Sequence, residues 1–161
     1  MQTLKLPAHE FLDARQIPYE IRTFSPDTEK GAANVAHALG LLENQCVKTL
    51  IFEVKDTGET CLIMVGADQS AISGKLKKAL GSRNIGLTHP DTVKAVTGYV
   101  IGSVPPFHWQ AQGYRSFIDE ALMSHDVLGV GAGVWGNEIM ITPSDLVRAS
   151  NATVVNLTRP D

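Results

Sequence analysis

Two apolar segments separated by a short polar turn place the strongest constraint on the fold of this 161-residue chain. Residues 46–54 and 60–66 are mostly apolar, and Asp56-Thr57-Gly58-Glu59 lies between them. Such a turn with glycine between two apolar segments is typical of a β-hairpin, because glycine readily adopts the positive φ values of tight turns. The chain is therefore expected to contain antiparallel strand pairing.

Helices and further strands are predicted on both sides of this hairpin. Capping residues, early prolines and glycines just beyond the last apolar position predict helices at 7–15, at 72–80, at 90–96, through Val35 to Gly40, and from Thr142 onward. Apolar segments predict strands at 19–24, 97–101, 114–118, 127–130, 138–141 and 153–157. Hairpins mixed with helices favour an α+β fold over a doubly wound sheet.

Composition limits the class of protein. A hydrophobic fraction of 43% and a charged fraction of 19% suit one globular domain spanning residues 1–161. The net charge of −3 argues against nucleic-acid binding over the whole surface, so any RNA contact is expected to be local. The basic cluster of Lys75, Lys77, Lys78 and Arg83 is compatible with a phosphate contact or with a solvated helix face.

Compartment and metal use are also constrained. Cys46 and Cys61 lie in apolar segments without a spaced motif, which predicts buried free thiols in a cytoplasmic protein. The N-terminal residues lack the layout of a signal peptide, and no apolar run approaches the roughly 18 residues of a membrane span. The five histidines are scattered without ligand spacing, so neither a metal nor another cofactor is expected.

The most distinctive loop candidate is Thr97-Gly98-Tyr99-Val100-Ile101-Gly102-Ser103-Val104-Pro105-Pro106-Phe107. Gly102 permits backbone angles closed to other residues, while Pro105 and Pro106 fix φ and lack an N–H. Such a stiff turn leaves its remaining N–H groups ready to meet a carbonyl or phosphate oxygen. The alternative is a tight loop without a function, since Gly-x-x-Pro alone is common in turns.

Lys48 is the most notable single residue. Alternation along the strand places it on the apolar row with Cys46, Leu50, Phe52 and Val54, opposite a more polar row that includes Val47, Thr49 and Ile51. A charged amine on an apolar face needs a partner or a cavity. Alternatively, its stem packs on the strand while the ammonium reaches water.

In order along the chain, Lys48, the Gly102–Pro105 loop and Gly131-Ala132-Gly133 followed by Glu138 resemble the motifs of the YbaK/EbsC family of aminoacyl-tRNA deacylases. That family includes the editing domain inserted in bacterial prolyl-tRNA synthetases, and the resemblance covers nearly the whole chain. It implies a freestanding α+β domain with a mixed, mostly antiparallel, barrel-like sheet surrounded by helices. Ser103 replaces a glycine found in many relatives, and His108-Trp109 replaces Gly-His, which bears on substrate choice.

The resemblance implies an ester hydrolase that removes Cys, Ala, Ser or Thr from the 3′ end of a mischarged tRNA. Water would attack with assistance from the substrate, no metal or cofactor would be needed, and an aminoacyl-tRNA synthetase is a possible partner. Lys48 would hold the terminal phosphate or the carbonyl oxygen, and Gly102 and Pro105 would complete the catalytic set. The implied substrate-binding residues are Thr49, Ser103, Val104, Phe107, Asp119, Gly131, Gly133 and Glu138.

Two other interpretations stay open. A non-catalytic module could bind a nucleotide, an RNA 3′ end or a protein partner. Ser103, His108 and Asp119 have the residue types of a serine hydrolase, but their spacing gives no reason for them to converge, and Asp119 equally suits a helix N-cap.

Overall fold

The computed structural model describes residues 5–160. The helices are α1 (Pro7–Ala14), α2 (Ala32–Leu39), α3 (Ser73–Leu80), α4 (Pro90–Thr97) and α5 (Pro143–Ser150), with short 3-10 turns at Glu43–Gln45 and Glu120–Ser124. The strands are β1 (Glu20–Thr23), β2 (Val47–Val54), β3 (Glu59–Gly66), β4 (Ile85–Leu87), β5 (Ser116–Asp119), β6 (Leu128–Gly131), β7 (Asn137–Ile141) and β8 (Thr153–Val155). The α+β class is confirmed, and glycines with positive φ follow α2, α3 and α4 as predicted.

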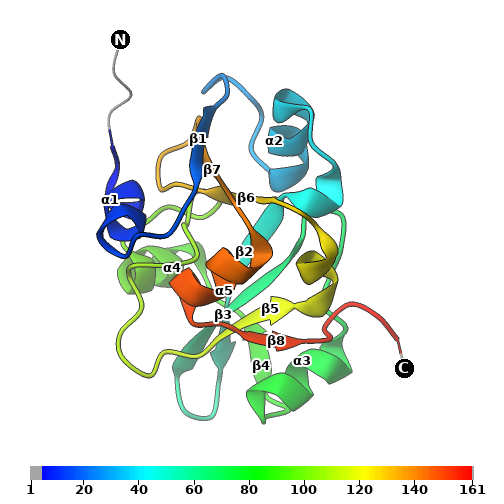
Figure 1. The fold of residues 1–161 in the computed structure, drawn as a ribbon. Coiled ribbons are helices and arrows are strands. Elements are labelled where there is room, and N and C mark those ends of the chain that lie inside the picture. The colour runs from blue at the N-terminus through cyan, green and yellow to red at the C-terminus, as the bar shows by residue number, and fades with distance from the viewer. Residues whose placement is uncertain (1–4, 161) are drawn as a thin grey trace.

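The strands form two sheets (Figure 1). The larger has the order β4-β2-β3-β5-β8, antiparallel up to β3 and parallel beyond it, and the smaller is the antiparallel set β1-β7-β6. They meet where Cys46, just before β2, bridges to Gly129 in β6. The described strands do not close into a barrel, so the expected barrel-like sheet is corrected to two sheets that touch at one edge.

One predicted strand, at residues 97–101, is absent from the described fold. Thr97 is the last residue of α4, and Gly98 ends the helix with φ 84°. The Tyr99 N–H donates to the Thr97 hydroxyl over 3.0 Å, which holds the chain in a bend. The short strand β4 was not predicted, since its three residues pair only with the end of β2.

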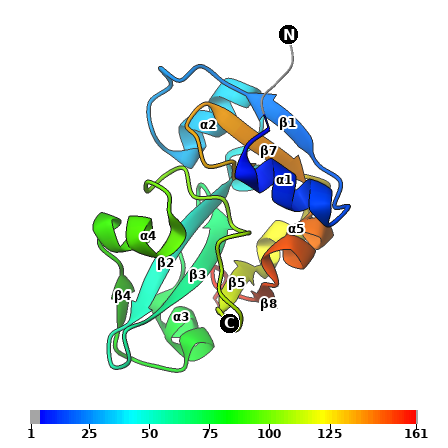
Figure 2. The same ribbon diagram turned by 90° about the vertical axis from the view of Figure 1, so that its left-hand side faces the viewer.

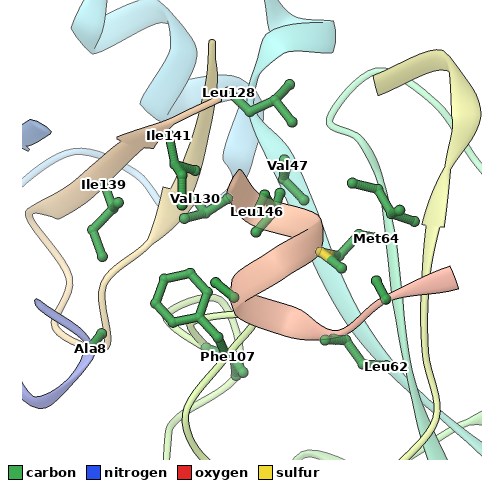
Figure 3. Close-up of a cluster of buried hydrophobic side chains, with 14 of the residues drawn as sticks. Ala8, Val47, Leu62, Met64, Phe107, Leu128, Val130, Ile139, Ile141 and Leu146 are labelled. Carbon is green, nitrogen blue, oxygen red and sulfur yellow. The ribbon is translucent and has the colours of Figure 1, made fainter. Parts of the chain in front are cut away.

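The main hydrophobic core lies between the two sheets and under α5 (Figure 3). Leu146 of α5 belongs to this cluster together with Val130 of β6 and Met64 of β3. Both ribbon views place α5 between the smaller sheet and the strands β5 and β8 (Figures 1 and 2). This helix therefore packs on the core that the two sheets share.

Both faces of β2 are covered. Val47 and Ile51, on the row expected to be more polar, are only 6% and 2% exposed. They pack in the main core, whereas Leu50 on the opposite row packs against a second cluster that includes Leu76 of α3. The row that is more polar in sequence therefore also packs in the core at Val47 and Ile51, because β2 is covered on both faces.

Two smaller findings concern the cysteines and the membrane. Cys46 and Cys61 are buried free thiols, as predicted. Among the described helices, none combines the length and the apolar character needed to cross a membrane.

Candidate active site

A cavity of about 190 Å³ opens where the two sheets meet. Its walls come from four parts of the chain: the start of β2, the N-terminal half of α2, the loop at 101–104, and the β6–β7 connection. The lining residues are Phe24, Gly31, Ala32, Val35, Val47, Lys48, Thr49, Leu50, Ile101, Gly102, Ser103, Val104, Gly131, Val134, Trp135, Asn137 and Glu138. Seven of the residues singled out in the sequence are in this list: Lys48, Thr49, Gly102, Ser103, Val104, Gly131 and Glu138.

Lys48 lies at the start of β2, where that strand leaves the shared edge of the sheets. Its Nζ donates to the backbone carbonyl of Gln69 over 2.6 Å. Within residues 5–160 it forms no ion pair, so two of its three N–H donors stay available. The ammonium is thus held by one bond on the cavity wall and can bind an oxygen there.

The loop wall is a tight turn. The Ser103 N–H donates to the Val100 carbonyl over 3.1 Å, and Gly102 has φ 90°, the value that the third residue of a type II turn requires. The Ser103 N–H is therefore already paired, so not every remaining N–H group of this loop is free, as the sequence had suggested. The N–H groups of Gly102 and Val104 have no hydrogen-bond partner among the described residues.

Gly131, at the end of β6, lets this loop approach the smaller sheet. A β-carbon there would lie 3.3 Å from the Val104 carbonyl oxygen and 3.4 Å from the Ser103 carbonyl. Few real side chains tolerate contacts of that length. The glycine therefore lets the two walls of the cavity approach each other closely.

Glu138 contributes a buried acid to the cavity. Glu138 is 6% exposed, and its carboxyl forms no hydrogen bond or ion pair with the described residues. Burial disfavours the charged form and raises the pKa of Glu138 from 4.5 to about 8. The carboxyl is therefore mostly protonated at neutral pH and has unused hydrogen-bonding capacity.

An aromatic wall was missed by the sequence analysis. Trp135 donates its Nε1–H to the Thr28 carbonyl over 3.0 Å, and its ring meets the edge of Phe24 at a centroid distance of 4.9 Å. Lys30 Nζ lies 4.2 Å from the centroid of the Trp135 ring. Because 107 residues separate Trp135 from Thr28, no local pattern could have found this wall.

Four residues with predicted roles do not line the cavity: Pro105, Phe107, Asp119 and Gly133. Phe107 is fully buried in the main core, stacked on Phe11 at 5.7 Å (Figure 3). Asp119 caps no helix with its side chain; its carboxylate accepts from the Leu157 N–H at 2.8 Å and the Thr158 hydroxyl at 2.6 Å. Asp119 therefore anchors the C-terminal segment.

The serine-hydrolase interpretation finds no geometric support among the described residues. His108 Nε2 lies 2.5 Å from the Tyr99 hydroxyl instead of contacting Ser103. Asp119 is fully engaged elsewhere. The described residues include no group of three His, Cys, Asp or Glu that could hold a metal ion.

The basic residues Lys77, Lys78 and Arg83 border a separate open depression at the end of α3. None of them lines the cavity. The cavity itself combines a cation, two unpaired backbone N–H groups, a buried carboxyl and apolar walls. Such a set can bind a small polar group and stabilise a developing negative charge on oxygen.

Comparison with known proteins finds a family and several relatives that this chain resembles. The model of the family described as the aminoacyl-tRNA editing domain matches residues 27–149. EbsC of Enterococcus faecalis, named for a provisionally assigned Cys-tRNA(Pro)/Cys-tRNA(Cys) deacylase activity, is 24% identical over 155 residues, covering 96% of this chain and 93% of that protein. The multifunctional Ser/Thr-tRNA deacylase ProXp-y of Escherichia coli is 27% identical over 128 residues, or 78% and 76% of the two chains.

Solved structures share the fold. The crystal structure of a protein assigned as a trans-editing enzyme for prolyl-tRNA synthetase superposes with a TM-score of 0.83 at 24% identity. The superposition covers 96% of this chain and 99% of that one.

Proposed function

Because this chain belongs to the aminoacyl-tRNA editing domain family, we propose that it hydrolyses the ester between a small amino acid and the terminal ribose of a mischarged tRNA. Membership in the family confirms the resemblance noted in the sequence. The observation that carries the proposal is the cavity in which Lys48, the unpaired N–H groups of Gly102 and Val104, and the buried Glu138 carboxyl come together.

Lys48 and the loop would stabilise the transition state. Water adds to the ester carbonyl, the carbonyl oxygen becomes an oxyanion, and the C–O bond to the ribose then breaks as a proton reaches the ribose oxygen. An ester needs no protein nucleophile, so the protein must supply position and a place for the negative charge. Lys48 would hold the carbonyl oxygen or the terminal phosphate, and the Gly102 and Val104 N–H groups would bind the aminoacyl end. The neighbouring ribose hydroxyl, or a cysteine thiol, would assist as part of the substrate.

Glu138 would receive the α-amino group, the polar substituent that aminoacyl esters have in common. Its carboxyl is buried, borders the cavity and lacks a partner among the described residues. A buried carboxylate is stabilised when a cation arrives beside it. Substrate binding would thus convert Glu138 from the protonated to the charged form.

The apolar walls of the cavity suit a small amino acid such as Cys, Ala, Ser or Thr. Val35, Leu50 and Trp135 border the cavity and would pack against a short side chain. Each extra methylene changes binding by only about 1–3 kcal/mol, so discrimination among these four would be modest. The named activities of the two relatives, toward Cys-tRNA and Ser/Thr-tRNA, fall within this range.

The proposed substrate is the 3′ end of tRNA, and a prolyl-tRNA synthetase is the candidate partner. Proline–tRNA ligase of Geobacillus kaustophilus is 30% identical over 89 residues. We place the reaction in one cytoplasmic domain formed by residues 1–161, since translation takes place in the cytoplasm.

The proposal is tested by deacylation of tRNAs charged with cysteine, alanine, serine, threonine or proline. Hydrolysis of one or two members of the panel is expected. Tight binding of an aminoacyl-adenosine analogue without release of amino acid from any ester would support the binding module instead.

A further inference from the structure

The backbone of His108 adopts a positive φ, which is uncommon for a residue other than glycine. Among the described residues, Gln16, His108 and Asn151 are the non-glycine residues with positive φ. Gln16 and Asn151 follow the ends of α1 and α5, where the left-handed region commonly closes a helix. His108 has φ 79° without a helix end to explain it, so its side chain must supply a reason to retain the residue there.

That reason is a hydrogen bond to the residue before the loop. The Tyr99 hydroxyl lies 2.5 Å from His108 Nε2, and the two rings meet edge to face at 5.4 Å. Burial lowers the pKa of His108, which favours the neutral imidazole. In the neutral ring, Nε2 can accept a hydrogen bond from the Tyr99 hydroxyl. Residues 99 and 108 therefore join the two ends of the segment that carries Gly102, Ser103 and Val104.

The two sides of this segment are anchored unequally. On its C-terminal side, Val104 and Phe107 are buried in the core, and the Trp109 indole donates to the Pro105 carbonyl over 2.6 Å. On its N-terminal side, Val100 and Ile101 are 57% and 45% exposed. Tyr99 is the anchor there.

Tyr99 also contacts the opposite wall of the cavity. A β-carbon on Gly133 would lie 2.6 Å from Cε1 of the Tyr99 ring, and Gly133 has φ 104°. The ring thus sits directly on the glycine that follows Gly131 and precedes Trp135. Tyr99 therefore touches both the loop and the 131–138 segment.

We propose that the Tyr99–His108 pair is a clamp that positions the Val100–Ser103 turn against the 131–138 wall of the cavity. The pair does not line the cavity and acts through the loop that does. Its catalytic consequence rests on the proposed deacylase function. Loosening the clamp misplaces the Gly102 and Val104 N–H groups relative to the carbonyl oxygen, which slows the chemical step more than it weakens binding.

The test compares Tyr99→Phe with Tyr114→Phe. Tyr114 is a matched control because its hydroxyl also makes one hydrogen bond, 3.0 Å to Thr60 Oγ1 of β3, but neither partner of that bond belongs to the 99–108 segment. Amide hydrogen exchange of the 100–107 peptide should accelerate about tenfold in Tyr99→Phe and not in Tyr114→Phe. In deacylation, kcat of Tyr99→Phe should fall about tenfold with KM within about twofold of wild type.

His108→Gly provides the second arm. Glycine favours positive φ, so the urea midpoint should not fall, yet the 100–107 peptide should exchange as fast as in Tyr99→Phe. The double variant should behave like His108→Gly alone, because both changes remove the same bond. Three results would overturn the clamp. The first is a wild-type exchange rate of the 100–107 peptide in Tyr99→Phe, and the second is an equal exchange rate in the two tyrosine variants. The third is an exchange rate in the double variant that equals the sum of the two single effects. If the wild-type protein hydrolyses no ester, the proposed function fails, while the exchange measurement still decides the clamp.

Discussion

The Oε2 atom of Glu138 lies 3.0 Å from the position that a β-carbon on Gly129 would occupy. The same position is 3.4 Å from Cys46 Sγ, so the absent side chain leaves room for the buried carboxyl beside the thiol. Burial, and secondarily the nearby Glu138 charge, raises the pKa of Cys46 to about 12. The thiol therefore stays protonated and is a packing residue, which leaves Glu138 as the ionisable group of this corner.

Gly129→Ala should displace the Glu138 carboxyl and lower kcat/KM for deacylation about tenfold or more. The added methyl meets a buried oxygen and a sulfur on a strand that cannot shift freely. Gly74→Ala is the matched control, because a β-carbon there has no heavy atom within 4 Å and lies on α3. Equal activity of the two variants, both folded by circular dichroism, would contradict this role for Gly129.

Stability should depend on pH through Glu138. Its pKa is about 8 in the folded protein and about 4.5 when unfolded, so between these values the folded state binds the extra proton. Stability therefore falls as pH rises from about 4.5 to 8, by an amount on the order of 5 kcal/mol at most, and levels off above.

Urea unfolding of wild type and Glu138→Gln across this interval measures the effect. As pH rises, the unfolding free energy of wild type should fall relative to that of Glu138→Gln. A difference that stays constant from pH 5 to pH 8 would show that Glu138 is not the group responsible.

Phe107→Leu should lower the unfolding free energy by about 1–3 kcal/mol without changing the ratio of deacylation rates among the charged tRNAs. The ring fills the main core and does not reach the cavity. The implied role of Phe107 as a substrate-binding residue predicts the opposite result, a changed ratio at nearly constant stability. Chemical denaturation and the tRNA panel together distinguish the two.

Local signals account for the elements that the sequence predicted correctly. These signals act within a few residues: the hairpin turn at Asp56–Glu59, the glycines at 40 and 81, and the Thr142 cap. The Thr142 hydroxyl accepts a hydrogen bond from the Asp145 N–H, as a helix cap does. The predicted strand at 97–101 failed because Gly98 ends α4 with positive φ, the Thr97 hydroxyl binds the Tyr99 N–H, and Val100 already begins a tight turn. Apolar character alone could not reveal these bends.

The candidate site was predictable where a motif is contiguous and unpredictable where the fold assembles distant segments. Lys48, Gly102 and Glu138 were found from motifs and do share one cavity. Trp135 and Phe24 were missed, since their contact joins residues more than one hundred positions apart. Within residues 102–107, the sequence could not tell which side chains face the cavity and which, like Phe107, face the core.

Trp135→Ala should broaden substrate selection. Removing the indole deletes part of the wall against Phe24 and enlarges the space near the aminoacyl side chain. Discrimination against an amino acid one or two methylenes larger should fall about tenfold or more, following the small energy of each methylene. The check is the ratio of kcat/KM for valine-charged and alanine-charged tRNA; an unchanged ratio would remove Trp135 from the specificity wall.

The most direct test of the central claim is the deacylation rate of Lys48→Met beside that of Lys55→Met. Both variants replace a lysine of the same segment with a side chain of similar length, but Lys55 is exposed beyond the end of β2 and does not line the cavity. Loss of a charge that stabilises the oxyanion should lower kcat by about a hundredfold or more, as the removal of one such donor does elsewhere. We expect this loss for Lys48→Met and a wild-type deacylation rate for Lys55→Met. Hydrolysis by Lys48→Met at the wild-type rate would contradict it.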